Sequence, residues 1–309
     1  MTKRHPPPIG GESVFAENPQ KFHRPFIRFP HEIASVPTMT NNTVVQNIQA
    51  PSVGTSARTA ASKYEMANPR FWISHFQRNR LNRPEPTWDA PLSLPSSVVK
   101  LLVKSLEQYQ LGDGGGPASL IAWNAETFRC SSEESKALVD LWFLEEKEHS
   151  RLLGGAVARL GGTPIQEHWS FSVFCGVRRW IGVDFELTVL LLTEIVSTIY
   201  YRLIQRHCQD EPIRAMCGLI MRDEAGHVAF HRARMALEGR KGKITYGAMW
   251  EAGFFLLGYA AATMLWVNHA SALCVMGATT REFYTEIRKE IGDFIGDLRR
   301  ETAAENAGA

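Results

Sequence analysis

The sequence predicts an all-α protein, and three observations support this expectation. From Ser96 onward, apolar residues recur at helical spacing almost without interruption. The sequence lacks segments in which Val or Ile alternates with polar residues between turns, the pattern typical of strands. The chain has 309 residues, of which 44% are hydrophobic, so it can bury a sizeable core. The pattern divides the chain into a largely irregular N-terminal arm (1–95), a four-helix bundle (96–240) and further C-terminal helices (241–302).

The N-terminal arm shows no sustained period. Residues 1–63 are rich in Pro, Asn, Thr and Ser, a composition that predicts an extended or disordered chain. In residues 64–95 aromatic residues interleave with arginines, as in NPRFWISHFQRNRLNRPEPTW. Surfaces that bind nucleic acids can have this composition. Acidic residues and prolines nearby instead favour a segment that packs on the surface of the domain.

Helical periodicity places six helices after the arm, one beginning with SSVVKLLVKSLEQYQL at Ser96 and the others over about 131–160, 184–207, 212–237, 244–275 and 280–300. Ser131 or Ser132, followed by glutamates, gives a capping signature for the second helix, and Gly161 follows its end. Pro212 suits the first turn of the fourth helix. The last helix is amphipathic, with Phe283, Ile287, Ile291, Phe294 and Leu298 at helical spacing.

The bulk composition limits the expected partners and compartment. A formal net charge of +2 without a dense Lys/Arg run argues against nucleic acid and against an anionic membrane. Five scattered cysteines without a C-x-x-C pair indicate a reducing compartment, taken here as the cytoplasm. The first residues lack the apolar core of a secretory signal. The apolar stretch 252–267 is shorter than the about 20 residues that span a bilayer, so it is expected to be a buried helix.

Two Glu-x-x-His motifs stand out, Glu146-x-x-His149 in the second helix and Glu224-x-x-His227 in the fourth. Residues three apart share a helix face, so each motif presents an oxygen and a nitrogen ligand to the same point. Both motifs lie on the apolar face of their helix, where an unpaired charge is costly to bury. Those faces are marked by Val139, Trp142, Phe143, Leu153 and Ala156 and by Ile213, Cys217, Ile220, Val228 and Met235.

A two-metal site in a four-helix bundle also needs a carboxylate from each of the other two helices. The third helix supplies Glu194, in phase with its apolar positions and 30 residues before Glu224, a spacing that brings two mid-helix residues level across a hairpin. Glu186 is the rival acid. It lies near the helix start, where the helix dipole favours an exposed carboxylate.

The first helix offers Asp113, which lies 33 residues before Glu146 and within the glycine-rich sequence YQLGDGGGPASL. Glu107 is held in reserve, because it shares a face with Lys100 and Lys104, which favours solvent. Glycine and proline cost helix stability, so the first helix is expected to bend or break near Asp113.

A carboxylate directly precedes each motif glutamate, namely Glu145 in EEKEH and Asp223 in DEAGH. Such a group can accept the outer ring N–H of a ligand histidine and fix its orientation. Each is expected to reach across to the histidine of the other helix hairpin.

EEKEH, DEAGH, the Glu194 helix and their spacing resemble the ferritin-like di-metal carboxylate proteins over about residues 96–237. This superfamily includes iron-storage ferritins, rubrerythrins, acyl desaturases and N-oxygenases. The resemblance implies a ferritin-like bundle that holds two irons, or an iron–manganese pair, through Glu146, His149, Glu194, Glu224, His227 and an acid of the first helix. That acid is usually glutamate, and here the shorter Asp113 takes the place.

The sequence leaves two roles open for each of two further residues. His231 lies one turn beyond His227 on the inward face. It is either a hydrogen-bonded core residue or an added ligand, as a third histidine is in some amine N-oxygenases. Tyr201, two turns past Glu194, either packs in the core or lines the pocket and relays an electron.

The resulting functional expectation is a di-iron oxidase or oxygenase that activates O2 to oxidise a small organic molecule. No catalytic residue beyond the metal ligands is expected. The expected partners are O2, the substrate and an external electron donor. A homodimer is compatible with the pattern. The chain is longer than a minimal bundle, and its extra apolar helices are suited to enclosing a substrate. The alternatives are iron or peroxide handling, as in ferritins and rubrerythrins, and a metal-free helical interaction protein.

Overall fold

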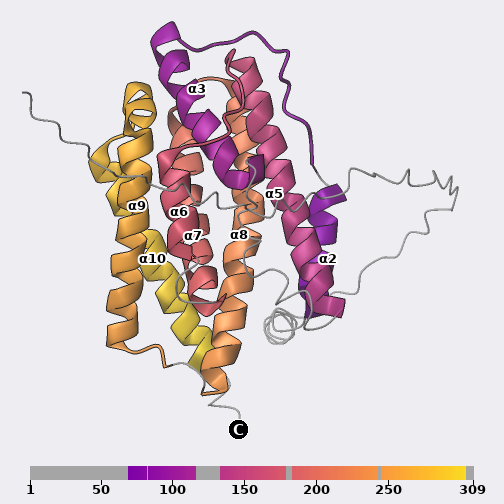
Figure 1. Ribbon diagram of the computed structural model, residues 1–309, viewed down its shortest axis with the longest axis vertical. Helices are drawn as coiled ribbons and strands as arrows, with labels where there is room; N and C mark the ends of the chain where they lie inside the picture. The colour runs from indigo at the N-terminus through magenta and orange to yellow at the C-terminus, as the bar shows by residue number, and fades with distance from the viewer. Residues whose placement is uncertain (1–68, 82, 116–132, 179–182, 243–244, 304–309) are drawn as a thin grey trace, which may run out of the picture. The chain divides into compact units, whose positions relative to one another are not determined.

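The computed structural model describes residues 69–81, 83–115, 133–178, 183–242 and 245–303 (Figure 1). These ranges contain helices and no strand, so the all-α prediction is confirmed for them. All of them belong to the unit formed by residues 53–309. The predicted irregular stretch 1–63 and the capping serines at 131–132 lie outside the described residues.

Four long helices correspond to those predicted for the bundle: α3 (Ser96–Gln110), α5 (Glu133–Arg159), α7 (Val183–His207) and α8 (Glu211–Arg240). α5 opens with Glu133 and Glu134, whose charges are favourable at a helix N-terminus. α8 is capped by Asp210, whose side chain accepts a hydrogen bond from the Ile213 N–H at 3.4 Å, and Pro212 lies in its first turn.

The helix that begins at Ser96 changes character at the glycine-rich sequence. Leu111–Gly115 forms a π-helical turn (η1) directly after α3. Glycine has little preference for the α-helix, so this segment can adopt the wider turn at low cost. Such turns are frequent at functional sites. The predicted irregularity near Asp113 is therefore confirmed.

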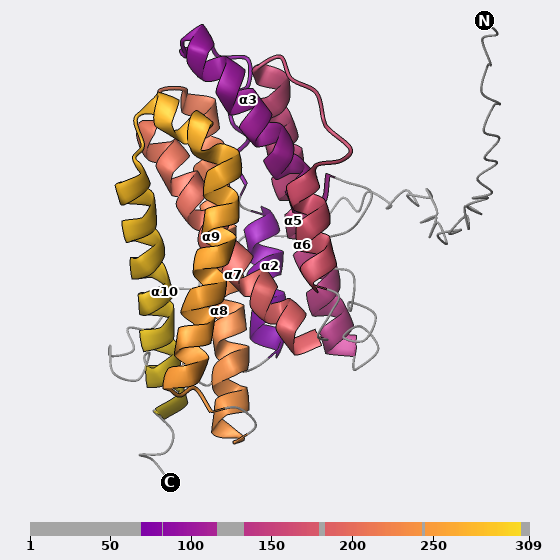
Figure 2. The same ribbon diagram turned by 60° about the vertical axis from the view of Figure 1, so that its left-hand side comes forward.

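α7 is the central helix of the core. It packs against α8, α9 (Ala248–Met276) and α10 (Thr280–Ala303), while α8 also contacts α5 and α10, and α3 contacts α5 and α9 (Figures 1 and 2). Most side chains of α7 are buried, which explains why its sequence is apolar on nearly every face. Among the described residues, the largest fully buried side chains include Leu102, Leu106, Leu153, Leu191, Ile195, Tyr200, Tyr201 and Phe283.

A buried ion pair fixes the end of α5 against the start of α8. Arg159 donates hydrogen bonds to both carboxylate oxygens of Asp210, at 2.9 and 2.7 Å, and to the carbonyl oxygens of Trp88, Ala90 and Pro91. The Arg159 side chain is 4% exposed and that of Asp210 is fully buried. This contact helps to keep the Glu-x-x-His segments of α5 and α8 level with each other.

Two helices were not anticipated from the sequence, α2 (Pro69–Leu81) and α6 (Trp169–Arg178). α2 lies in the arm that was expected to be irregular, and it packs against α5 and α8. Trp72 and Phe76, one turn apart, are buried there, and both rings contact Phe230 of α8. The 13-residue segment carries too short an apolar pattern to be recognised beside its arginines, and its packing on α5 and α8 stabilises the helix.

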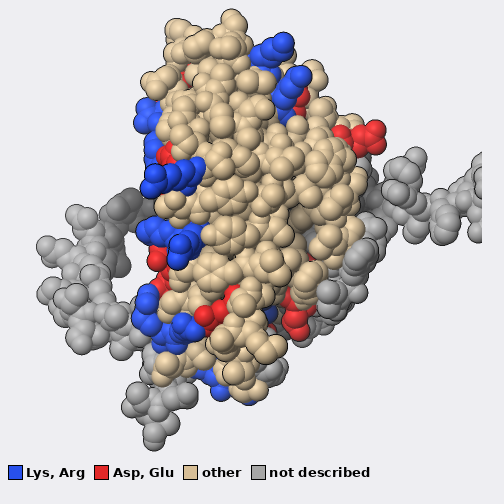
Figure 3. Space-filling model, turned by 90° about the vertical axis from the view of Figure 1, so that its left-hand side faces the viewer, with Lys and Arg blue, Asp and Glu red and all other residues tan. Residues whose placement is uncertain are grey.

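The expectation of a buried helix around residues 252–267 is wrong. α9 is 29 residues long and, like residues 184–207, is long and apolar enough to cross a membrane. In the most apolar window of each, 72% of 184–207 is buried but only 17% of α9. Met249 and Leu256 are 91% and 74% exposed. Figure 3 looks onto this side and shows a broad area without charged side chains, bordered along one edge by Lys and Arg.

Candidate metal centre

The Glu-x-x-His motifs of α5 and α8 point into the interior, as their spacing predicts. His149 and His227 are fully buried, and Glu146 and Glu224 are 9% and 2% exposed. α7 adds Glu194, which is 8% exposed. Three helices therefore bring carboxylates and imidazoles together in a region that water scarcely reaches.

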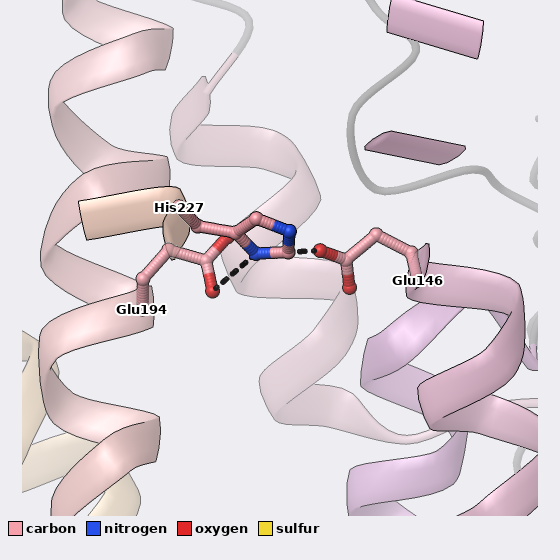
Figure 4. Close-up of side chains that lie close together, drawn as sticks. All are labelled: Glu146, Glu194 and His227. Carbon is pink, nitrogen blue, oxygen red and sulfur yellow. Dashed lines mark ion pairs between the residues drawn. The ribbon is translucent and has the colours of Figure 1, made fainter. Parts of the chain in front are cut away.

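Glu146, Glu194 and His227 point toward one another from α5, α7 and α8 (Figure 4). Each offers one ligand atom, and these atoms all lie within 4.8 Å of one another. Carboxylate and imidazole ligands suit iron and manganese as well as zinc. The three residues thus form a group that can hold a metal ion.

The two motif glutamates each face both histidines, with a different oxygen toward each. Nδ1 of His227 lies 3.1 Å from Oε2 of Glu224 and 3.4 Å from Oε1 of Glu146. Nδ1 of His149 lies 3.6 Å from Oε1 of Glu224 and 3.7 Å from Oε2 of Glu146. The side chains thus define two neighbouring positions, one beside each histidine, that Glu146 and Glu224 can bridge.

Of these four contacts, the one between His227 and Glu224 has the geometry of a hydrogen bond, whereas the other three are longer. Two ligands of one ion lie about 3.0–3.6 Å apart when each bond is about 2.1 Å long. Nδ1 of His149 is buried and has no hydrogen-bond partner among the described residues. A buried nitrogen of this kind is costly unless something binds it. The unpartnered Nδ1 of His149 is thus available as a ligand beside the group formed by Glu146, Glu194 and His227.

Without bound cations, the carboxylates must share protons. Burial, followed by the charge of Glu194, raises the pKa of Glu224 well above its usual range. Burial also acts to raise the pKa of Glu194, but the neighbouring Glu224 and His227 outweigh burial and lower it to about 2. In the metal-free protein the proton of this pair is therefore held on Glu224, while Glu194 is ionised.

Both histidines are charged in the metal-free protein. Burial alone would lower the pKa of each ring. For His149, the hydrogen bond to Asp223 and the nearby carboxylate of Glu146 reverse this effect. For His227, the hydrogen bond to Glu145 and the nearby carboxylate of Glu194 do so. Both pKa values consequently lie well above the usual range of histidine. The protons stand in for the positive charge that the carboxylates require.

The predicted crosswise contacts of the outer acids are confirmed. Nε2 of His149 lies 3.2 Å from Oδ2 of Asp223, and Nε2 of His227 lies 3.0 Å from Oε2 of Glu145. Both acids are fully buried. A carboxylate at Nε2 keeps the ring proton there and leaves the Nδ1 lone pair directed at the two positions when the histidine is neutral.

One positively charged residue joins these two acids and was missed by sequence reasoning. Nη2 of Arg83 lies 2.6 Å from Oδ2 of Asp223 and 3.3 Å from Oε1 of Glu145. Its side chain is only 10% exposed. Arg83 stands in an arginine-rich stretch just after α2, and nothing in that stretch distinguishes it from Arg78 or Arg80.

The structure favours Asp113 over Glu107 as the acid of the first helix. Tyr201 donates a hydrogen bond of 2.8 Å to Oδ2 of Asp113. Burial and the negative charge of Glu146 raise the pKa of Asp113 to about 7, as expected for a carboxyl group beside the cluster. Glu107 instead accepts a hydrogen bond from the Thr163 backbone N–H at the surface.

The structure corrects or extends the sequence expectations for three other residues. Glu186 was expected to be exposed at the start of its helix, but it is 2% exposed. Tyr201 is fully buried and also contacts the acid Asp113, so its role is not packing alone. Trp142 was regarded only as an apolar position, yet its indole N–H donates to Oε1 of Glu146 at 2.9 Å. The spacing of four residues between them was the available signal.

His231 is fully buried, and neither ring nitrogen has a hydrogen-bond partner among the described residues. Burial, followed by the charge of Arg234, lowers its pKa to about 3, so the ring is neutral. The ring packs against that of Trp142, with centroids 5.1 Å apart. The described contacts therefore do not support the alternative in which His231 is a hydrogen-bonded residue of the core.

His231→Leu is expected to have opposite effects on the two forms of the protein. Removing an unsatisfied buried imidazole should stabilise the metal-free protein by about 1–3 kcal/mol. The same change should weaken binding of one of the two metals, because a nitrogen ligand is lost. Chemical unfolding without metal and Fe(II) titration test the two effects. Unchanged affinity for both ions would leave His231 as a core residue.

Comparison with family models, with curated proteins and with solved structures finds no match for this chain. Function is therefore inferred from the geometry of the centre.

Proposed function

We propose that the chain is a ferritin-like di-metal carboxylate protein that uses two irons, or an iron–manganese pair, to activate O2 and oxidise a small organic molecule. The observation that supports this most directly is the pair of buried glutamates that each face both histidines. Glu146 and Glu224 are assigned as bridging ligands, with His149 and Asp113 on one side. His227, Glu194 and His231 are assigned to the other side.

Bound iron(II) ions would supply the electrons and Lewis acidity for reducing O2. The chain's own part is to orient and shield the centre. Asp223 and Glu145 hold the histidine rings through Nε2, and Trp142 holds Glu146. The ring of Phe76 packs on His227, with ring centroids 5.8 Å apart, so α2 helps to exclude water.

The alternatives fit these observations less well. Burying several carboxylates together costs folding free energy, even when protons offset their repulsion. A metal-free interaction protein would gain nothing from such a cluster. Iron storage needs a path and a space for a mineral, and nothing in the described residues favours either. The proposal also includes an external electron donor, and a reducing compartment such as the cytoplasm, where free cysteines stay reduced.

Metal binding is expected to release protons and to strengthen as pH rises. Ligands must be deprotonated, and the pKa values of Glu224, His149 and His227 are raised in the metal-free protein. Each displaced proton makes the apparent affinity rise about tenfold per pH unit. Calorimetry in buffers of different ionisation enthalpy measures the release. Affinity that does not change with pH would contradict the assigned ligands.

The stability of the metal-free protein should respond to pH with the opposite sign. A histidine whose pKa is raised in the folded state stabilises it fully below the unfolded value of about 6.5, and this contribution is lost as pH rises through the folded pKa. Chemical unfolding of the metal-free protein above neutral pH checks the trend.

The proposed activity is tested by loading the protein with Fe(II) without oxygen and then admitting O2. The expected result is two Fe(II) oxidised per chain, a centre that a chemical reductant restores for another round, and no accumulation of iron beyond two per chain. Continued accumulation of oxidised iron would instead support storage. Failure to bind iron would support the metal-free alternative.

A further inference from the structure

A second buried polar cluster lies between α3, α7 and α9, apart from the metal centre. The Oγ of Ser105 is 2.6 Å from the hydroxyl of Tyr200 and 2.8 Å from Nδ1 of His269. Ser105 is 3% exposed, Tyr200 fully buried and His269 8% exposed. Buried polar groups at these distances form a connected chain of hydrogen bonds.

The direction of this chain follows from satisfying every hydroxyl. Ser105 is the hydrogen-bond partner of the Tyr200 hydroxyl among the described residues. If Tyr200 donates to Ser105, then Ser105 donates to the lone pair on Nδ1 of His269, and both hydroxyl protons are used. The reverse direction would leave the buried Tyr200 proton without an acceptor, which is costly. Burial lowers the pKa of His269 to about 3, so its ring is neutral and the lone pair is free.

Aromatic rings connect this cluster to the metal centre. The ring of Tyr109 stacks on that of Tyr200, with centroids 3.9 Å apart and planes 6° from parallel. Tyr109 and Tyr200 lie 5.3 and 5.4 Å from the ring of Tyr201. Tyr201 in turn donates its hydrogen bond to Asp113. Rings in direct contact give an electron a continuous path between the centre and Tyr200.

We propose that Tyr200 is a redox-active residue that reduces the oxidised two-metal centre by one electron through the rings of Tyr201 and Tyr109. Tyr200 loses one electron to the centre and its phenolic proton to Ser105, and Ser105 passes its own proton to Nδ1 of His269. The products are a neutral tyrosyl radical, a protonated His269 and a centre reduced by one electron. The proposal rests on the proposed function, because the oxidant is the two-iron centre after its reaction with O2.

Tyr200 has a proton acceptor that lies outside the metal centre, because its hydroxyl leads through Ser105 to His269. The Tyr201 proton is directed at Asp113, within the metal centre. A phenol becomes a strong acid once it loses an electron, so a weakly basic neutral imidazole is a sufficient acceptor. The role of the cluster is to take up an oxidising equivalent when no substrate is bound, away from the metal ligands.

The first arm of the test uses iron-loaded protein that carries ring-deuterated tyrosine. It is given O2 without substrate, frozen and examined by electron paramagnetic resonance. A tyrosyl radical is expected in the wild type, identified by its change on deuteration. Tyr200→Phe keeps the ring and its stacking but should lack this signal. Tyr246→Phe is the matched control, because it removes the hydroxyl of a remote, half-buried tyrosine that donates to the Met235 carbonyl oxygen.

The second arm needs no metal. A photo-oxidised ruthenium complex removes electrons from the metal-free protein, and the lifetime of the resulting tyrosyl radical is followed optically. Tyr200→Phe should lose the long-lived radical. Ser105→Ala keeps every ring but interrupts proton transfer, so it should shorten the lifetime.

Equal radical yields and lifetimes in wild type, Tyr200→Phe and Ser105→Ala would overturn the assignment of Tyr200. If iron does not bind but the variants still differ in the metal-free arm, the proposed function fails while the redox-active character of Tyr200 stands. If iron binds and reacts without a radical at Tyr200, the proposed function survives and the electron path is wrong.

Discussion

Glu146→Ala is expected to leave a folded protein that retains neither metal ion. Glu146 directs Oε1 toward His227 and Oε2 toward His149, so one substitution removes a ligand from both positions. The fold should persist, because the change removes one of several crowded buried acids rather than an apolar core residue. Metal analysis after anaerobic Fe(II) loading and desalting should find two irons per wild-type chain and essentially none in the variant.

Glu148→Ala is the matched control, because it removes a carboxylate two residues further along α5. Glu148 pairs with Arg151 at the surface and lies outside the cluster. This variant should keep both irons. Full iron content in Glu146→Ala would show that Glu146 is not a bridging ligand.

Arg83→Met is expected to destabilise the metal-free protein by about 1–3 kcal/mol, because two buried carboxylates each lose a charge-assisted contact. Asp223 keeps Arg222 and His149, and Glu145 keeps His227, so neither acid is left without a partner. Arg83 pairs through one nitrogen with both Asp223 and Glu145, whose side chains are fully buried. These acids orient His149 and His227, so iron affinity should fall as well. Denaturant unfolding and Fe(II) titration measure the two effects.

Arg80→Met provides the comparison for this substitution. Arg80 is an exposed residue in the last turn of α2, three positions before Arg83, and its replacement should change neither stability nor iron affinity appreciably. If Arg83→Met behaves like Arg80→Met, the guanidinium does not hold the two acids in place.

The sequence predicts the long helices well because their apolar residues repeat over many turns. α5, α7 and α8 each extend for 25 residues or more, and such periods are hard to misread. α2 was missed because it has only 13 residues and its two buried aromatics stand among arginines. The exposure of α9 was also beyond sequence reasoning. An apolar helix looks the same whether the rest of the chain covers it or not.

The inner part of the centre could be predicted because helix geometry fixes it. Spacing by three residues and position on an apolar face are enough to place Glu146, His149, Glu224 and His227 together. The crosswise contacts of Glu145 and Asp223 follow from the same geometry. Arg83 comes from a segment without a repeating pattern, so its position depends on tertiary packing.

The sequence alone could not decide between two roles for a residue, and the structure was required. The buried and unpartnered ring of His231 became evident only once its neighbours were placed. The contact between Tyr201 and Asp113 depends on the π-helical turn, whose detailed geometry a glycine-rich sequence does not specify.

The most direct measurement is anomalous X-ray diffraction at the iron edge from crystals of the Fe(II)-loaded protein. Two peaks about 3.5–4 Å apart are expected, as in other two-metal centres. One should lie beside Nδ1 of His149 and the other beside Nδ1 of His227, with Glu146 and Glu224 contacting both. A single peak, peaks elsewhere on the protein, or none under saturating Fe(II) would contradict a two-iron centre in this core.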